Sequence, residues 1–217
     1  MNIRRNYFCV VEGQQEIIYL KRIAELFTNF PERVVKFNPV IGNADKLNRK
    51  KSLPDYDRVC FFDHDFNQVE FERNLNTCIK LDSKRKRTKN CPGYRTYHAY
   101  SNICFDLWLI LHREQGYTTR LVSSADGYID DVRRIYSLNK NADIKEEKVM
   151  EKIVSQISLD DVRTAIANAQ RIRKSKLPSD KIFTDESNFY YSPPDFSIDM
   201  FLNTVLKESG LTGVGGT

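Results

Sequence analysis

The feature that most constrains the fold is a short apolar run that ends in two aspartates, Val59-Cys60-Phe61-Phe62-Asp63-His64-Asp65. An uninterrupted run of β-branched and aromatic residues of this length is typical of a strand buried on both faces, as in a parallel sheet. In open α/β sheets, functional groups lie just beyond the carboxyl ends of the strands. We therefore expect Asp63 and Asp65 to mark a site at that edge.

Two interpretations of this pair of carboxylates are open. If the backbone stays extended, the side chains of Asp63 and Asp65 point the same way, and they repel each other unless a divalent cation joins them. The alternative is a strand that ends in a solvated acidic turn, which is the more frequent case for an isolated Asp-x-Asp. The rest of the chain has to decide between the two.

A second strand with an acidic end precedes this run. Residues 6–11 read Asn-Tyr-Phe-Cys-Val-Val and stop at Glu12-Gly13, and an apolar pattern of helical period follows over residues 14–27. We also expect strands over 33–40 and 94–100 and helices over 42–51, 67–81, 126–138, 144–157, 158–172 and 198–206. This alternation predicts an α/β fold, with a mainly parallel sheet flanked by helices and then a mostly helical C-terminal part.

An apolar segment follows the strand expected over 94–100. Residues 103–112 are apolar nearly all round, which predicts a buried helix with Ser101 as its N-cap. Asp106 is the sole charge in its middle, and a buried carboxylate is costly unless it is paired, hydrogen-bonded or bound to metal. Asn102 precedes it by four positions, so we expect the two on one helix face. An ion pair and a role at the site are about equally compatible with Asp106.

The positive charge of the chain is concentrated. The formal net charge is +5, and a dense basic block over 80–89 contains Lys84, Arg85, Lys86 and Arg87. Such blocks are usually solvated surface, but they also attract the phosphates of nucleic acids. The block favours a nucleic-acid partner only slightly.

Other classes of protein are disfavoured. The chain contains no Gly-x-Gly-x-x-Gly motif after a strand, no Gly-rich loop ending in Lys-Ser/Thr and no Gly-x-Ser-x-Gly elbow. The five cysteines form no Cys-x-x-Cys pair, which predicts reduced thiols. We find no run of membrane-spanning length and no signal-peptide pattern, and we expect a cytoplasmic protein without membrane contact.

The acidic ends of the two strands resemble the Toprim catalytic domain of topoisomerases, primases and the overcoming-lysogenization-defect nucleases. Residues 10–16, Val-Val-Glu-Gly-Gln-Gln-Glu, are similar to the V-E-G-x-x-E motif of those nucleases. Residues 99–112, Ala-Tyr-Ser-Asn-Ile-Cys-Phe-Asp-Leu-Trp-Leu-Ile-Leu-His, are similar to the A-Y-S-N-P-C-F-E-L-W-L-L-L-H segment of the RloB-like family, small Toprim-type proteins encoded in bacterial restriction and phage-defence loci. The motifs follow the family's order, so the resemblance covers most of the chain.

The chain departs from the family pattern at three positions. Ile103 replaces a proline, and Asp106 replaces a glutamate and shortens its reach by one methylene group. His64 stands between the two aspartates, where the family usually has an arginine that could contact phosphate. The third departure bears most directly on activity.

The resemblance implies a Toprim-like core over residues 1–115 and a helical extension over 116–217, packed as one compact unit. It implies a nuclease that depends on Mg²⁺ or Mn²⁺ and cuts RNA, including transfer RNA, or DNA as an anti-phage effector. A partner ATPase is also implied, and whether the chain forms a homo-oligomer is left open. The resemblance implies that Glu12, Asp63 and Asp65 are catalytic and that these three residues and Glu16 bind the metal. It implies supporting roles for Asn102, Asp106 and His64, and nucleic-acid binding by Lys84, Arg85, Lys86 and Arg87.

Two other functions are considered. One is a Toprim-like module that binds nucleic acid or a partner protein and does not cut, with its carboxylates neutralised by Arg or Lys. The other is a receiver-like phosphotransfer domain, which leaves residues 99–112 unexplained. The distance between the carboxylates of Glu12, Asp63 and Asp65 distinguishes the first from the nuclease.

Overall fold

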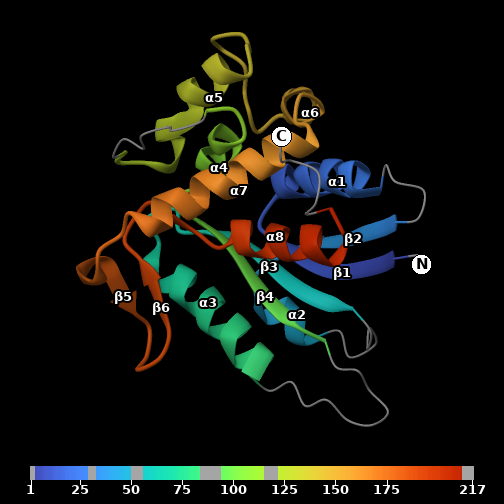
Figure 1. Ribbon diagram of the computed structural model, residues 1–217. Helices are drawn as coiled ribbons and strands as arrows, with labels where there is room; N and C mark the ends of the chain where they lie inside the picture. Colours follow the sequence, from blue (N-terminus) through green and yellow to red (C-terminus); the bar gives the residue numbers. More distant parts are fainter. Residues whose placement is uncertain (1–2, 29–32, 50–55, 84–93, 115–121, 212–217) are drawn as a thin grey trace.

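The computed structural model describes residues 3–28, 33–49, 56–83, 94–114 and 122–211. A five-stranded sheet in the order β2-β1-β3-β4-β7 forms its centre (Figure 1). The strands are β1 (Ile3–Val11), β2 (Arg33–Ile41), β3 (Asp57–Asp63), β4 (Thr96–Asn102) and β7 (Asp195–Phe196). The first four run parallel to their neighbours, and only β7, at the edge, is antiparallel. The predicted α/β fold is confirmed.

Helices and a hairpin cover the two faces of the sheet, which explains the uninterrupted apolar strands. Along β1, Tyr7, Cys9 and Val11 face one core and Phe8 and Val10 the other. The larger core lies under the helices at the top and front of Figure 1. These are α1 (Gln14–Thr28), α4 (Phe105–Leu111), α5 (Ile129–Ile135), α6 (Glu147–Ser155), α7 (Leu159–Lys174) and α8 (Ile198–Glu208).

The smaller core lies under α2 (Asp45–Arg49), α3 (Gln68–Ser83) and the two-stranded hairpin of β5 (Lys181–Phe183) and β6 (Phe189–Tyr191). Two 3₁₀ helices, Ala125–Tyr128 and Pro178–Asp180, complete the secondary structure of the described ranges. The hairpin is a correction, because the sequence pattern predicted neither a strand nor a helix over residues 178–194. Its strands are only three residues long, too short for periodicity to reveal them.

The end of β4 is a second correction. Ser101 is not an N-cap and Asn102 is not helical: both belong to β4, and α4 begins only at Phe105, with Cys104 as its N-cap. Ser101 pairs with Asp63 of β3 on one side and with Phe196 of β7 on the other. Strand pairing with distant residues therefore overrides the local capping preference of serine.

The apolar segment predicted to be a buried helix is confirmed, since all seven residues of α4 are buried. At the start of α7, the Ser158 and Asp161 side chains accept hydrogen bonds from each other's backbone N–H groups, as the capping-box pattern predicts. The four described cysteines are free and buried, and Cys91 lies outside the described residues.

The C-terminal part of the chain returns to the sheet. β7 extends the sheet beside β4, and α8 packs its apolar side on the larger core. Residues 115–121, where the predicted boundary between core and extension falls, lie outside the described ranges, so that boundary stays a prediction. None of the helices in the described ranges has both the length and the apolar character needed to cross a membrane.

Candidate metal centre

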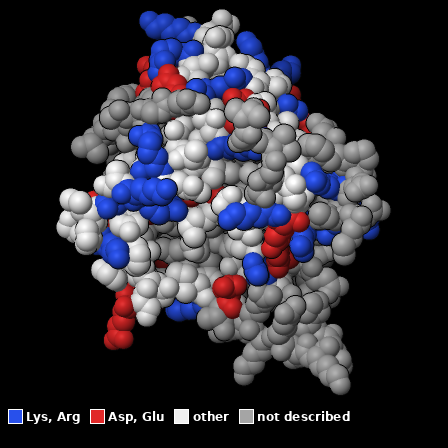
Figure 2. Space-filling model, in the orientation of Figure 1, with Lys and Arg blue, Asp and Glu red and all other residues white. Residues whose placement is uncertain are grey.

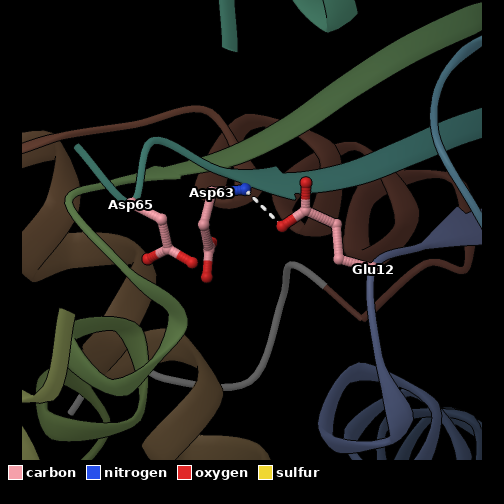
Figure 3. Close-up of side chains that lie close together, drawn as sticks. All are labelled: Glu12, Asp63 and Asp65. Atoms are coloured by element: carbon pink, nitrogen blue, oxygen red, sulfur yellow. Dashed lines mark hydrogen bonds between the residues drawn. The ribbon is translucent and has the colours of Figure 1, made fainter. Parts of the chain in front are cut away.

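Three carboxylates converge at the carboxyl edge of the sheet. Glu12 follows β1 directly, Asp63 is the last residue of β3, and Asp65 lies two positions further on. Each offers one oxygen, and these oxygens all lie within 4.8 Å of one another (Figure 3). The two strands are parallel neighbours, so their acidic ends meet at the same edge. We call Glu12, Asp63 and Asp65 the acidic cluster.

Backbone N–H groups hold the acidic cluster in place. The Asp63 N–H donates to Glu12 Oε2 at 3.1 Å, as the dashed line in Figure 3 shows. The Phe105 N–H donates to Asp63 Oδ2 at 2.8 Å. Phe105 is the first residue of α4, where unpaired N–H groups and the helix dipole favour a negative charge. The apolar helix after β4 thus orients the central aspartate.

The turn after β3 carries backbone strain. Asp65 and Phe66 have φ angles of 42° and 59°, in the left-handed region that aspartate tolerates but a bulky residue such as Phe66 rarely adopts. The surrounding structure holds the turn: the His64 N–H donates to Ser101 O at 3.2 Å and the Asp65 N–H to Ile103 O at 3.0 Å. Strain of about 1–3 kcal/mol per residue is typical of functional sites. The chain therefore does not stay extended through Asp65, and a held turn places this carboxylate in the acidic cluster.

The electrostatics of the acidic cluster favour a bound cation. Burial raises the pKa of Glu12 to about 7, the Asp63 N–H opposes this, and the charges of Glu16 and Asp65 add to it. Burial also raises the pKa of Asp63 well above its usual range, with further contributions from Glu16 and Glu12. Within the part of the chain that the structure describes, no Lys or Arg forms an ion pair with the acidic cluster. No ion pair within the described residues therefore offsets its negative charges.

Two further carboxylates lie close by. Glu16 is buried in the first turn of α1, and its Oε2 accepts from the Gly13 N–H at 3.0 Å. Burial raises the pKa of Glu16, and the charge of Asp65 raises it further. Asp106, in the first turn of α4, is only 6% exposed, and burial raises its pKa to about 7. Neither belongs to the 4.8 Å group, so the metal-ligand role of Glu16 stays a prediction.

Sequence reasoning missed Lys145, the cation that acts on these carboxylates. Burial raises the pKa of Asp65 and of Asp106, and the positive charge of Lys145 opposes both shifts. Lys145 is exposed, and its Nζ pairs with Asp126 Oδ1 at 3.3 Å. It belongs to a turn before α6, some eighty positions after Asp65, and no motif surrounds it. No sequence signal could have distinguished it from the other basic residues.

The predicted supporting residues have different surroundings. The His64 Nδ1 accepts from the Phe66 N–H at 3.2 Å, and its ring lies 5.2 Å from that of Phe71. Burial lowers its pKa, so it is neutral near pH 7. Asn102 is fully buried, and its Nδ2 donates to Tyr191 O at 3.3 Å. Because Asn102 ends β4, the prediction that it shares a helix face with Asp106 is wrong. Lys84, Arg85, Lys86 and Arg87 lie outside the described residues.

A buried polar network joins α1 to α4. The Trp108 Nε1–H donates to Tyr19 Oη at 2.9 Å, and Tyr19 Oη lies 3.1 Å from His112 Nε2. His112 Nδ1 donates to the carbonyl of Trp108, so Nε2 accepts from the Tyr19 hydroxyl. Burial lowers the pKa of His112 to about 4. His112 is thus neutral, although it is the C-cap of α4, where the helix dipole favours a positive charge. The network fixes the two helices that carry Glu16 and Asp106.

Comparison with known proteins gives one match. The model of a family described as RloB-like protein matches residues 7–191, which includes both acidic strand ends and α4. No curated protein and no solved structure matches the chain.

Proposed function

Because the chain belongs to the RloB-like protein family, we propose that it is a metal-dependent phosphodiesterase of Toprim type that cuts RNA or DNA. The observation that carries this proposal is the convergence of Glu12, Asp63 and Asp65 within 4.8 Å at the carboxyl edge of a parallel sheet. Carboxylates at this edge of the sheet can hold divalent cations. Hydrolysis of a phosphodiester needs such positive charge next to the anionic phosphate of the substrate.

The donor set fits Mg²⁺ or Mn²⁺. All three residues offer carboxylate oxygens, the hard ligands that these ions prefer. The raised pKa values of Glu12 and Asp63 mean that the carboxylates repel one another and lose hydration, and a cation relieves both costs. When bound, the metal would lower the pKa of a water molecule and offset the charge that grows on the phosphate.

The chain's own residues divide the remaining work. Glu12, held by the Asp63 N–H, would either bind the metal or take a proton from water as a general base. The Phe105 N–H orients Asp63, and the held turn orients Asp65. Lys145 supplies an exposed ammonium group whose field reaches Asp65, where it would attract the substrate phosphate.

The non-cutting module is retained as the second candidate because of His64. The family usually carries an arginine there, whereas the His64 ring is neutral, packs on Phe71 and accepts a backbone hydrogen bond. It therefore contributes no fixed positive charge to a phosphate. In this case, the protein binds nucleic acid or a partner without cleaving it.

Several features of the proposed function rest on the resemblance alone. These are the choice between RNA, including transfer RNA, and DNA, the anti-phage role, the partner ATPase and any homo-oligomer. The basic block over 84–87, expected to grip the nucleic-acid backbone, stays a prediction as well.

The test incubates purified protein with panels of labelled RNA and DNA in Mg²⁺, Mn²⁺ or EDTA. We expect cleavage with either metal, no cleavage in EDTA, and loss of cleavage in Asp63→Ala with the fold retained by circular dichroism. Glu151→Gln, which removes an exposed charge from α6, is the matched control and should cleave as the wild type does. Full activity of Asp63→Ala would refute the mechanism, and wild-type binding without cleavage would favour the second candidate.

A further inference from the structure

The hairpin of β5 and β6 has one buried face and one aromatic face. Ile182 and Tyr190 form a cross-strand pair that packs into the smaller core. Side chains alternate along a strand, so their neighbours point outward. The outward residues are Lys181, Phe183, Phe189 and Tyr191, which we call the hairpin face.

The rings of the hairpin face are close together and open to solvent. Phe183 is 60% exposed and Phe189 is 39% exposed, although phenylalanine is usually buried. The ring centroids of Phe183 and Phe189 are 5.7 Å apart, and those of Phe189 and Tyr191 are 5.4 Å apart. The Lys181 Nζ lies 4.2 Å from the Phe189 centroid. Cross-strand pairing stabilises the hairpin, but it does not require the exposed residues to be phenylalanines.

The hairpin that carries this face packs near the acidic cluster. On its buried side, the Tyr190 ring lies 4.9 Å from that of Phe71, and the Phe71 ring lies 5.2 Å from that of His64, between the two aspartates. The Tyr191 carbonyl accepts from Asn102 Nδ2, at the end of β4 beside Asp63. A strand of nucleic acid with a phosphate at the cluster would therefore reach the hairpin within a few nucleotides.

Positive charge adjoins the hairpin face. Lys176, just after α7, donates from its Nζ to the Ser192 carbonyl beyond the end of β6, and Lys181 begins β5; neither forms an ion pair with a carboxylate in the described ranges. Figure 2 shows basic side chains on the left of the molecule, where the end of α7 meets the hairpin in Figure 1. A face that offers aromatic rings and adjacent cations complements a ligand with flat bases and a phosphate backbone.

We infer that the hairpin face is a binding site for single-stranded nucleic acid, on which unpaired bases stack beside the acidic cluster. The inference rests on the proposed function and narrows its substrate to single strands or loops. In a duplex the flat faces of the bases are stacked on one another, and only unpaired bases can lie on an aromatic ring. Lys181, freed from the Phe189 ring by an incoming base, would then pair with a phosphate.

The test measures binding without cleavage, by fluorescence anisotropy in EDTA. The probes are labelled oligouridylate of about 15 nucleotides, an abasic strand of the same length and backbone, and the corresponding duplex. We expect Phe189→Ala to weaken binding of the single strand about 5- to 150-fold, the range measured for the loss of one base-stacking contact. Phe189→Tyr, which keeps a ring, should bind as the wild type does, and so should Met200→Ala, which removes an exposed apolar side chain from α8.

The outcomes separate this inference from the proposed function. Unchanged binding by Phe189→Ala, or equal wild-type affinity for the abasic strand, would overturn the inference even if the wild type cleaves normally. Base-dependent binding that Phe189→Ala removes would uphold the inference even if the wild type never cleaves. A wild-type dimer that Phe189→Ala converts to a monomer would assign the hairpin face to a second copy of the chain and also overturn it. Phe183→Ala repeats the test on the opposite strand.

Discussion

Replacing Asp63 by asparagine is expected to stabilise the metal-free protein and to abolish its response to Mg²⁺. Asparagine keeps the shape of the side chain and an oxygen that can accept from the Phe105 N–H, but it removes the charge. A site selected to bind a cation holds like charges together at the expense of stability, so removing one charge relieves that cost. The two effects have opposite signs, which makes the variant more informative than a simple loss of activity.

The size of the effect follows from the geometry of the acidic cluster. Two unit charges 4.8 Å apart repel by about 3.5 kcal/mol at an effective dielectric constant near 20, and by about 0.9 kcal/mol in bulk water. The neutral amide oxygen makes a hydrogen bond weaker by about 1 kcal/mol than the carboxylate does. Because Asp63 is partly buried, the first value applies, and the net gain for the metal-free variant is about 2.5 kcal/mol, which raises the melting temperature of a chain of this size by about 5–10 °C.

The assay is thermal unfolding of the wild type, Asp63→Asn and Glu151→Gln in EDTA and in Mg²⁺. Mg²⁺ at a hundred times its dissociation constant should stabilise the wild type and Glu151→Gln by about 2.7 kcal/mol and leave Asp63→Asn unchanged. In EDTA, only Asp63→Asn should melt above the wild type. Equal stabilisation of Asp63→Asn by Mg²⁺, or a melting temperature in EDTA below that of the wild type, would refute the reasoning.

Three further predictions concern other parts of the molecule. Lys145→Ala should slow cleavage about 10- to 100-fold in kcat, because a cation near the developing charge is lost, whereas Lys148→Ala, on the exposed first turn of α6, should not. His112 has a pKa of about 4, below the unfolded value near 6.5, so its stabilising effect is complete above pH 6.5 and is lost as the pH falls toward 4. In denaturant unfolding, the free energy of unfolding of the wild type should fall by about 2 kcal/mol between pH 8 and pH 5, and that of His112→Gln should not. Arg173→Met should lower the free energy of unfolding by about 3–5 kcal/mol in the same assay. The substitution removes the cation that forms ion pairs with the buried Asp195 at 3.3 Å and the buried Asp199 at 3.1 Å. A decrease below about 1 kcal/mol would contradict this.

Much of the site was predictable because its signals are local. Apolar runs over 6–11 and 59–62 specify buried strands, and a carboxylate directly after each run lies at its carboxyl end. Parallel pairing then brings Glu12 and Asp63 to the same edge, as α/β topology predicts. The helices α1, α3 and α8 followed in the same way from apolar residues of helical period.

The errors share one physical cause, which is that pairing between distant segments outweighs local preference. Ser101 has the chemistry of an N-cap, yet β7, nearly a hundred positions later, pairs with it and keeps it in a strand. The hairpin face depends on the burial of Ile182 and Tyr190 against α3, which no short window shows. Lys145 reaches the carboxylates only because α5 and α6 pack over α1 and α4.

The sequence by itself thus determined the fold class, the strand ends that carry the acidic cluster and the buried character of α4, since each is written in a few neighbouring residues. Only the tertiary structure decided that the three carboxylates lie within reach of one cation without an ion pair to Lys or Arg in the described ranges. It also decided that the hairpin with the exposed aromatic rings packs, through Tyr190 and Phe71, near them. The reason is that distances between side chains depend on how elements far apart in the chain pack, and periodicity carries no information about that packing.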